Sequence, residues 1–199
     1  MNKAIRTPVR KSAILKKELI TKKGFELICE KGFYNVTTID IAKYAGVSTG
    51  IIYQYFKDKK DIIISGLKEY YLSIFYPLIA ILEKRISPNN LEEILKEIIS
   101  SFLKTHKLKE EAHDNLMAMS YLDKDIAKIF YQNEIEMTKK IGDILVNNGF
   151  KKDNIYEKVH LIMGILDNYC HEKVYHKHEI LDYDIMEKEV IELVIKILS

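Results

Sequence analysis

The stretch from Thr37 to Asp61 constrains the fold more than any other part of the chain. Two short helical runs are separated there by Ala45-Gly46-Val47-Ser48, a length that suits a tight turn between two helices in contact. Gly46 can adopt the left-handed conformation that ends a helix, and Ala42 has only a methyl group, so the second helix can approach the first closely. The pattern therefore predicts two steeply crossing helices.

Three helix starts are marked within this stretch. Thr37 and Asp40 match a capping box, in which two side chains satisfy free backbone N–H groups. Ser48 is a favourable N-cap for the second helix, and Asp58 with Asp61 repeats the capping pattern for a third.

The second helix, from about Ser48 to Phe56, is expected to have one buried and one outward face. Ile52 and Phe56 fall on the inward side. A small and polar outward face at the start of a helix suits insertion into the DNA major groove. Gln54 is suited to pair with adenine, and Thr49 is suited to contact a thymine methyl group. The outward residues are Thr49, Gly50, Tyr53 and Gln54.

Phosphate contacts are expected from the same region. Tyr53 and Tyr55 offer hydroxyl groups, and Lys59 offers a charged ammonium group. The alternative is that the aromatic residues are core residues of a helical bundle. We expect this of Phe56, and we expect DNA contact of Tyr53.

These residues together resemble the DNA-binding segment of the tetracycline-repressor (TetR) family, over about Ile20 to Ile63. The resemblance implies phosphate contacts at Thr38, Ser48, Tyr53, Tyr55 and Lys59, with Thr49, Gly50 and Gln54 nearest the bases; Thr37 completes the expected DNA-binding set. The matching positions are Thr37, Thr38, Ile41, Ala42, Ala45, Gly46, Val47, Ser48, Gly50, Ile52, Tyr53, Tyr55, Phe56 and Lys59.

Two positions depart from the family pattern. Thr49 stands where the family often has a basic residue, which removes one expected phosphate or guanine contact and leaves the operator sequence open. Lys23-Gly24 stands where the first helix usually has alanines. Because glycine costs about 1 kcal/mol of helix propensity, a locally weakened first helix is predicted.

Charge is distributed unevenly along the 199 residues. Residues 1–60 contain 13 Lys and Arg against 5 Asp and Glu, a net charge of +8, whereas residues 61–199 contain 18 against 24, a net charge of −6. This asymmetry is typical of a nucleic-acid-binding domain joined to a domain that does not contact phosphate. We therefore expect residues 1–60 to form a basic arm and a helix-turn-helix domain, and residues 61–199 to form a helical domain.

The remaining composition favours a cytoplasmic protein. Cys29 and Cys170 have no paired spacing, which argues against a secreted disulfide scaffold, and Cys29 is expected to be a core residue. The longest apolar stretch, Tyr70 to Leu82, contains Pro77 and is well short of the roughly 20 residues that span a membrane. No membrane partner is expected.

An all-α fold is predicted for the whole chain. Residues 1–12 form a basic arm with Lys3 and Arg6, which either reaches across DNA or is a solvated tail. Expected helices then run over about 13–31, 59–86, 91–106 and 123–148, with a mixed pattern over 108–121 and two final helices. Pro77 should kink the helix that begins at Lys59.

Apolar residues of the second domain suggest two further sites. Aromatic and methionine side chains could line a ligand cavity of the kind that helical bundles enclose, although residues at such spacing are usually plain core. The candidates are Phe75, Tyr76, Phe102, Met117, Tyr121, Phe130 and Met163.

The last helix is apolar on most sides and needs cover on most sides. A two-fold interface made by the last two helices would provide this cover, and the resemblance implies the same mode of dimerisation. Two DNA-binding domains would then face two half-sites of a palindrome. The candidates are Ile162, Leu166, Tyr169, Val190, Leu193, Val194 and Ile197.

Three histidines, His171, His176 and His178, lie close together near Cys170. A transition-metal sensor would use such groups. Only His171 and His178 share a helical face, so a solvated cluster without a metal ion is the expected state. No cofactor is expected.

Three classes of function remain in view. A ligand-responsive, homodimeric transcriptional regulator, more specifically a repressor by the resemblance, is the leading hypothesis. An architectural or cell-cycle DNA-binding protein of the same fold, with no small effector, is the alternative. An enzyme is not expected, because no nucleophile-base spacing, phosphate-binding glycine loop or metal-ligand motif is present in the sequence.

Overall fold

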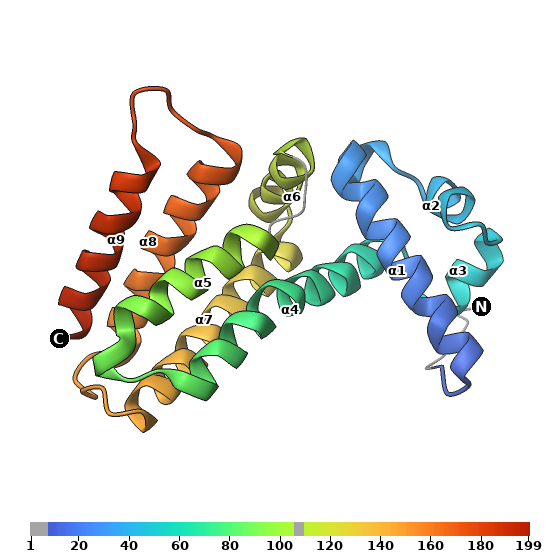
Figure 1. Ribbon diagram of the computed structural model, residues 1–199. Coiled ribbons are helices and arrows are strands. Elements are labelled where there is room, and N and C mark those ends of the chain that lie inside the picture. The colour runs from blue at the N-terminus through green and yellow to red at the C-terminus, as the bar shows by residue number, and fades with distance from the viewer. Residues whose placement is uncertain (1–7, 106–109) are drawn as a thin grey trace. The chain divides into compact units, whose positions relative to one another are not determined.

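The computed structural model describes residues 8–105 and 110–199. Residues 1–7 of the expected arm, with Lys3 and Arg6, and residues 106–109 lie outside the described residues. The described part contains α-helices and two short 3-10 helices (η) but no strand (Figure 1), which confirms the all-α prediction. The elements are α1 (Lys11–Lys31), η1 (Phe33–Asn35), α2 (Thr38–Ala45), α3 (Thr49–Tyr55), α4 (Lys59–Arg85), η2 (Pro88–Asn90), α5 (Leu91–Thr105), α6 (Glu110–Leu122), α7 (Lys124–Asn147), α8 (Ile155–Tyr175) and α9 (Tyr183–Leu198).

The chain folds into two compact units. The first contains residues 8–71 and 110–130, and the second contains residues 72–105 and 131–199. α4 and α7 contribute to both units, whereas α6 belongs to the first.

The turn between α2 and α3 has the conformation predicted from the sequence. Gly46 ends α2 with φ of 66° and ψ of 32°, in the left-handed region. The backbone N–H of Val47 donates to the carbonyl of Ala42 at 3.0 Å, and the N–H of Gly46 donates to that of Lys43 at 3.3 Å. These two bonds satisfy carbonyls that the end of a helix leaves free.

The helix starts are capped in different ways. At α2, the N–H of Asp40 donates to the Thr37 hydroxyl at 3.2 Å, and the N–H of Thr37 donates to the Asp40 carboxylate at 2.9 Å, so the predicted capping box is confirmed. At α4, the N–H of Asp61 donates to the Asp58 carboxylate at 3.0 Å. Ser48 is the N-cap of α3 by position, but its side chain makes no capping hydrogen bond in the described structure.

One hydrophobic core holds the first unit together. It contains side chains from each of the helices α1, α2, α3 and α4, from the start of α7, and from α6, whose Leu116 is completely buried. The residues with no exposed surface are Ile20, Ile28, Ile41, Ile52, Ile62, Ile63, Leu67, Leu116 and Ile126. The segment of α6 and α7 from Glu110 to Phe130 is therefore structurally part of the helix-turn-helix unit.

The helix α4 continues through Pro77 as one helix to Arg85. By length and composition alone, its residues Lys59–Lys84 are long and apolar enough to cross a membrane. Ile62, Ile63 and Leu67 of this helix are fully buried in the core of the first unit, as is typical of a core helix.

In the second unit, α8 and α9 lie side by side (Figure 1), and α5 packs on both. Tyr169 and Val194 have no exposed surface and form the centre of the α8–α9 contact. The Tyr169 hydroxyl donates to the Glu187 carboxylate at 2.7 Å and accepts from the Lys173 ammonium at 2.8 Å, so the buried ring has hydrogen-bond partners for its polar end.

Candidate DNA-binding site

The outward face of α3 carries the residues that the sequence placed there. Tyr53 is 49% exposed, and Ser48, Gly50 and Gln54 are also exposed, whereas Thr49 is half-buried. Ile52 and Phe56 are buried, as predicted. The helix therefore presents a surface of small and polar side chains to solvent, and a groove-inserted helix needs such a surface.

Two of the expected phosphate contacts are more enclosed. Tyr55 is only 9% exposed and its ring packs in the core. The Lys59 ammonium donates to the carbonyls of Phe33 and Val36, at 2.5 and 2.8 Å, and lies 4.3 Å from the centre of the Phe33 ring. Burial lowers the pKa of Lys59. Lys59 therefore uses two of its three N–H donors to hold the η1 turn, and DNA contacts by Tyr55 and Lys59 stay predictions.

The start of α2 completes the expected DNA-binding set. Thr38 is the first residue of the helix and is half-buried, and Thr37 is exposed. The hydrogen bond from the Thr37 hydroxyl lowers the pKa of the Asp40 carboxyl. Because the Thr37 side chain is engaged in the capping box, its primary role in the structure is to fix the first turn of α2.

The candidate ligand residues lie in different surroundings. Tyr76 and Tyr121 are 73% and 86% exposed, so both rings lie on the surface, whereas Phe102 is buried. The others, Phe75, Met117, Phe130 and Met163, are half-buried. Met117, Tyr121 and Phe130 belong to the first unit and Phe75, Tyr76, Phe102 and Met163 to the second. A ligand pocket built from these residues stays a prediction.

Most of the candidate dimer residues are buried or half-buried within the chain itself. The buried ones are Ile162, Tyr169, Val190 and Val194, and the half-buried ones are Leu166 and Ile197; Leu193 is exposed. Leu161 of α8, which the sequence pattern did not single out, is 61% exposed. The exposed apolar residues of α8 and α9 thus include Leu193, which is in the predicted set, and Leu161, which is not, and the dimer interface stays a prediction.

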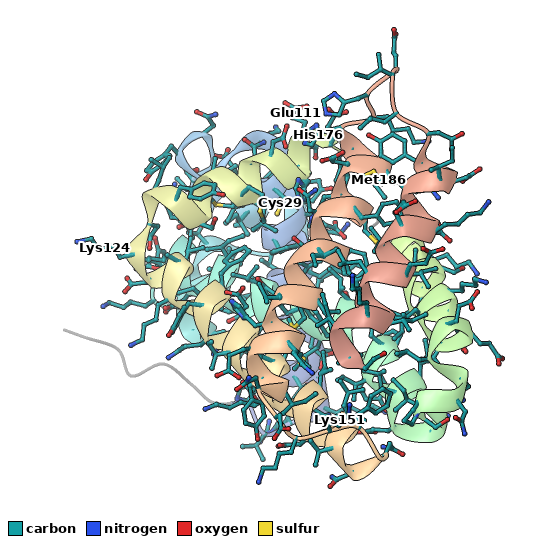
Figure 2. The ribbon with its side chains drawn as sticks, turned by 90° about the vertical axis from the view of Figure 1, so that its left-hand side faces the viewer. Cys29, Glu111, Lys124, Lys151, His176 and Met186 are labelled. Atoms are coloured by element: carbon teal, nitrogen blue, oxygen red, sulfur yellow. The ribbon has the colours of Figure 1, made fainter. Side chains whose placement is uncertain are left out.

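A groove of about 500 Å³ lies on this surface. A β-carbon at Gly164 would meet no atom of another element of the chain within 4 Å. The groove is lined by Glu134, His160, Leu161, Gly164, Ile165, Asn168, Tyr169, Met186 and Val190, of which Met186 is labelled in Figure 2.

The three histidines near the end of α8 have separate contacts. His171 lies 3.1 Å from the Asp167 carboxylate and stacks on the ring of Tyr175. The backbone N–H of His178 donates to the Tyr183 hydroxyl at 3.1 Å. His176 follows the last residue of α8.

Two polar contacts of the first unit had no signal in the sequence. The Lys60 ammonium lies between the carboxylates of Asp123 and Asp125, and the Asn115 side chain donates to the carbonyl of Cys29. The partners are 86 residues apart for Asn115 and Cys29 and 65 for Lys60 and Asp125. Only the fold brings such residues together.

The helix-turn-helix segment matches a known family. Residues 20–65 fit the sequence pattern described as "Bacterial regulatory proteins, tetR family". The HTH-type transcriptional regulator HbdR of Aromatoleum sp. (strain CIB) is 54% identical over 43 residues, which are 22% of this chain and 19% of that relative. The fatty acid metabolism regulator protein of Bacillus subtilis (strain 168) is 30% identical over 120 residues, which are 60% of this chain and 55% of that relative. The chain thus matches about one fifth and about half of the length of these curated relatives.

The fold is shared over nearly the whole chain. A solved structure described as a TetR-family transcriptional regulator of Mesorhizobium loti has a TM-score of 0.70, covering 95% of this chain and 98% of that one, at 16% identity. Residues 20–65 therefore match the TetR family of bacterial regulatory proteins, and the chain shares its fold with solved structures described as TetR-family regulators.

Proposed function

We propose that this protein is a homodimeric transcriptional repressor of the cytoplasm that binds palindromic operator DNA and is released by a small apolar or amphipathic ligand. The exposed polar face of α3 is the single observation that carries DNA recognition. Tyr53 and Gln54 are exposed there while Ile52 is completely buried, so the helix is fixed to the core by one side and free on the other.

Charge supports the same role. The net charge of +8 over residues 1–60 favours association with the phosphate backbone, and the charge of −6 over the rest of the chain does not. Ser48 adds an exposed hydroxyl group that is not used as a helix cap. Phosphate contacts orient the protein on DNA, and the side chains of Thr49 and Gln54 would then meet base edges.

Dimerisation is supported by the exposed surface of α8 and α9. Leu161 and Leu193 are exposed, and the groove beside Gly164 has room for side chains of a second copy. A two-fold dimer uses the same patch on both subunits, so one interface would cover each exposed leucine in both copies.

The ligand class is suggested by a relative. The match to the B. subtilis fatty acid metabolism regulator extends over 120 residues, which is more than the first 71 residues of the chain, so it reaches beyond the helix-turn-helix. Fatty acids are amphipathic, so they fit the proposed class of effector, a small apolar or amphipathic molecule that binds a helical unit with an apolar interior. Binding would act by differential affinity, because a ligand that prefers the conformation with misplaced DNA-binding domains lowers operator affinity.

The test is binding of the purified protein to DNA upstream of its own gene, compared with shuffled DNA, as a salt series and with Tyr53→Ala alongside. We expect at least about a thousandfold preference for the upstream DNA, a steep fall of affinity with salt, and weaker binding by the variant. Decanoate and palmitate are then added to the complex, and release together with a raised melting temperature supports the effector role. Equal and weak binding to both DNAs, with no palindrome selected from random DNA, would overturn the regulator and favour the architectural alternative.

A further inference from the structure

Two lysines open α4 next to the helix-turn-helix, and either is a natural candidate for a phosphate contact. The structure engages both inside the protein. Lys59 holds the η1 turn, as described above, and the Lys60 ammonium lies 2.8 Å from Oδ2 of Asp123 and 2.5 Å from Oδ2 of Asp125. The Lys60 side chain is only 30% exposed. Two carboxylates thus neutralise its charge, and a phosphate would have to compete with them for the ammonium group.

The partner of Lys60 also caps a helix. Oδ1 of Asp123 accepts the backbone N–H groups of Asp125 at 2.9 Å and Ile126 at 3.2 Å, which begin α7. Burial opposes the charge of Asp123, but the hydrogen bonds from Lys60 and from these N–H groups lower the pKa of its carboxyl. The ion pair therefore joins the first turn of α4 to the first turn of α7.

A second contact fixes the same segment to α1. Nδ2 of Asn115 in α6 donates to the carbonyl of Cys29 at 3.0 Å and lies 3.5 Å from that of Glu30. Carbonyls in the last turn of a helix have no partner within the helix, so the amide supplies one. Cys29, labelled in Figure 2, is itself buried. The segment from Glu110 to Phe130 is thus attached to the helix-turn-helix unit at two polar points and through the shared core.

The start of α4 controls the end of α3. Only three residues separate Tyr55, the last residue of α3, from Lys59. This link is fixed by the backbone N–H of Lys57, which donates to the Asp61 carboxylate at 2.8 Å, and by the Asp58 cap. A displacement of the first turn of α4 must therefore displace the end of α3 as well.

We propose that Lys60 is a positioning residue for DNA binding, which acts through Asp123 to hold α4 and α3 in place and does not contact DNA. The proposal rests on the proposed function and names a residue on which the DNA-binding surface of α3 depends. Loss of the ion pair loosens α3, and the ordering that binding then requires lowers affinity.

The experiment is a double-mutant cycle on operator affinity with Lys60→Met, Asp123→Asn and both together. Asn remains a good N-cap, so Asp123→Asn removes the charge and keeps the start of α7. Lys124→Met is the matched control, because Lys124 lies between the two aspartates in the sequence and extends into solvent (Figure 2). We expect each single variant to bind roughly tenfold more weakly, the double variant no more weakly than either, and the control to bind normally.

Two further readouts separate positioning from simple structural damage. Lys60→Arg, which keeps the ion pair, should restore affinity. Amide hydrogen exchange in Thr49–Tyr55 should be faster in Lys60→Met than in the unmodified protein, measured well below the melting temperature of the variant, where it stays folded. The slope of log affinity against log salt should not change.

The opposing results are equally specific. A slope lowered by about one in Lys60→Met would identify a direct phosphate contact and overturn the proposal. An effect of Lys60→Met that persists when both Asp123 and Asp125 are replaced by Asn would do the same, because neither ion pair is then left to break. If the unmodified protein binds its operator and the cycle is additive, only the role of Lys60 fails. If the unmodified protein prefers no DNA sequence, the proposed function fails and the role of Lys60 in DNA binding fails with it.

Discussion

Gly24 of α1 lies directly against Ile62 of α4. A β-carbon at Gly24 would stand 2.4 Å from Cγ2 of Ile62, and one at Gly66 of α4 would stand 2.5 Å from Cβ of Phe25. Each helix thus has a glycine opposite a large side chain of the other. This reciprocal packing lets α1 and α4 cross in contact, and α4 is the helix that begins directly after α3.

Gly66→Ala is expected to destabilise the protein by about 1–3 kcal/mol, the usual range for an overpacked core. The nearest atom is the Cβ of Phe25, which cannot move without its backbone, so the gain in helix propensity does not compensate. Urea unfolding followed by circular dichroism measures the difference. Gly50→Ala is the control, because its β-carbon would lie 3.9 Å from the nearest neighbouring atom. A Gly66→Ala protein as stable as this control would contradict the packing argument.

The same contact shows what helix propensity leaves out. Propensity predicts that Gly24 weakens the first helix, whereas α1 runs from Lys11 to Lys31 with Gly24 buried against α4, so the local stability of this helix stays a prediction. The reason for the glycine is tertiary: it is required by a side chain 38 residues away in the chain, and no local rule contains it. Segments with a clear local signal were predicted well. α5 begins at Leu91, directly after the Ser87-Pro88 break, and is described as far as Thr105; the predicted end at His106 lies outside the described residues.

The candidate site divides in the same way. The exposed face of α3 followed from helical periodicity, because burial of Ile52 and Phe56 decides which side faces solvent. The enclosed ring of Tyr55 and the internal contacts of Lys59 did not follow, since both depend on η1 and on the core around them. Residues that join distant segments, such as Lys60 and Asn115, leave no periodic signal at all.

Gln54→Ala is expected to weaken operator binding about tenfold or more, because a good contact to one base pair contributes about 1–3 kcal/mol of discrimination. Binding to shuffled DNA and the salt dependence should remain unchanged, since no charge is removed. Fluorescence anisotropy with both DNAs measures this. Gln132→Ala is the matched control, an exposed glutamine of α7. Equal losses on both DNAs would show that Gln54 does not read sequence.

The stability of the folded protein is expected to depend on pH through the carboxyl group of Asp123. Its pKa is lower in the folded protein than the ordinary value of 3.8, so the folded state favours the ionised form. The stabilisation is therefore complete above about pH 4 and is lost as pH falls through the folded pKa. Melting temperatures of the unmodified protein and of Asp123→Asn should differ at pH 7 and converge toward pH 3. Asp153→Asn, at an exposed aspartate after α7, should show no such convergence. If the difference between the two melting temperatures grew on acidification, the pKa of Asp123 would not be lowered in the folded protein.

Both cysteines are expected to be unreactive in the folded protein. Burial raises the pKa of Cys29 and of Cys170 to about 12, and each side chain has 1% of its surface exposed. Because the thiolate is the nucleophile, reaction with a disulfide reagent such as DTNB at pH 8 should be slow until the chain opens. Two thiols should react at once in guanidinium chloride. Rapid labelling of one thiol in the native protein would show that its helix opens readily.

Charge placed on α8 or on α9 should separate the proposed dimer. Leu161→Glu and Leu193→Glu put a carboxylate where a two-fold interface would exclude water, and the symmetry repeats each substitution in both subunits. Neither residue is buried within the subunit, so the fold should survive. Light scattering with size-exclusion chromatography at micromolar concentration should show dimers of the unmodified protein and monomers of the variants. Leu72→Glu is the control, because Leu72 of α4 is 62% exposed against 61% for Leu161. The α8–α9 surface is wrong as the interface if Leu161→Glu stays dimeric or if Leu72→Glu alone dissociates the dimer.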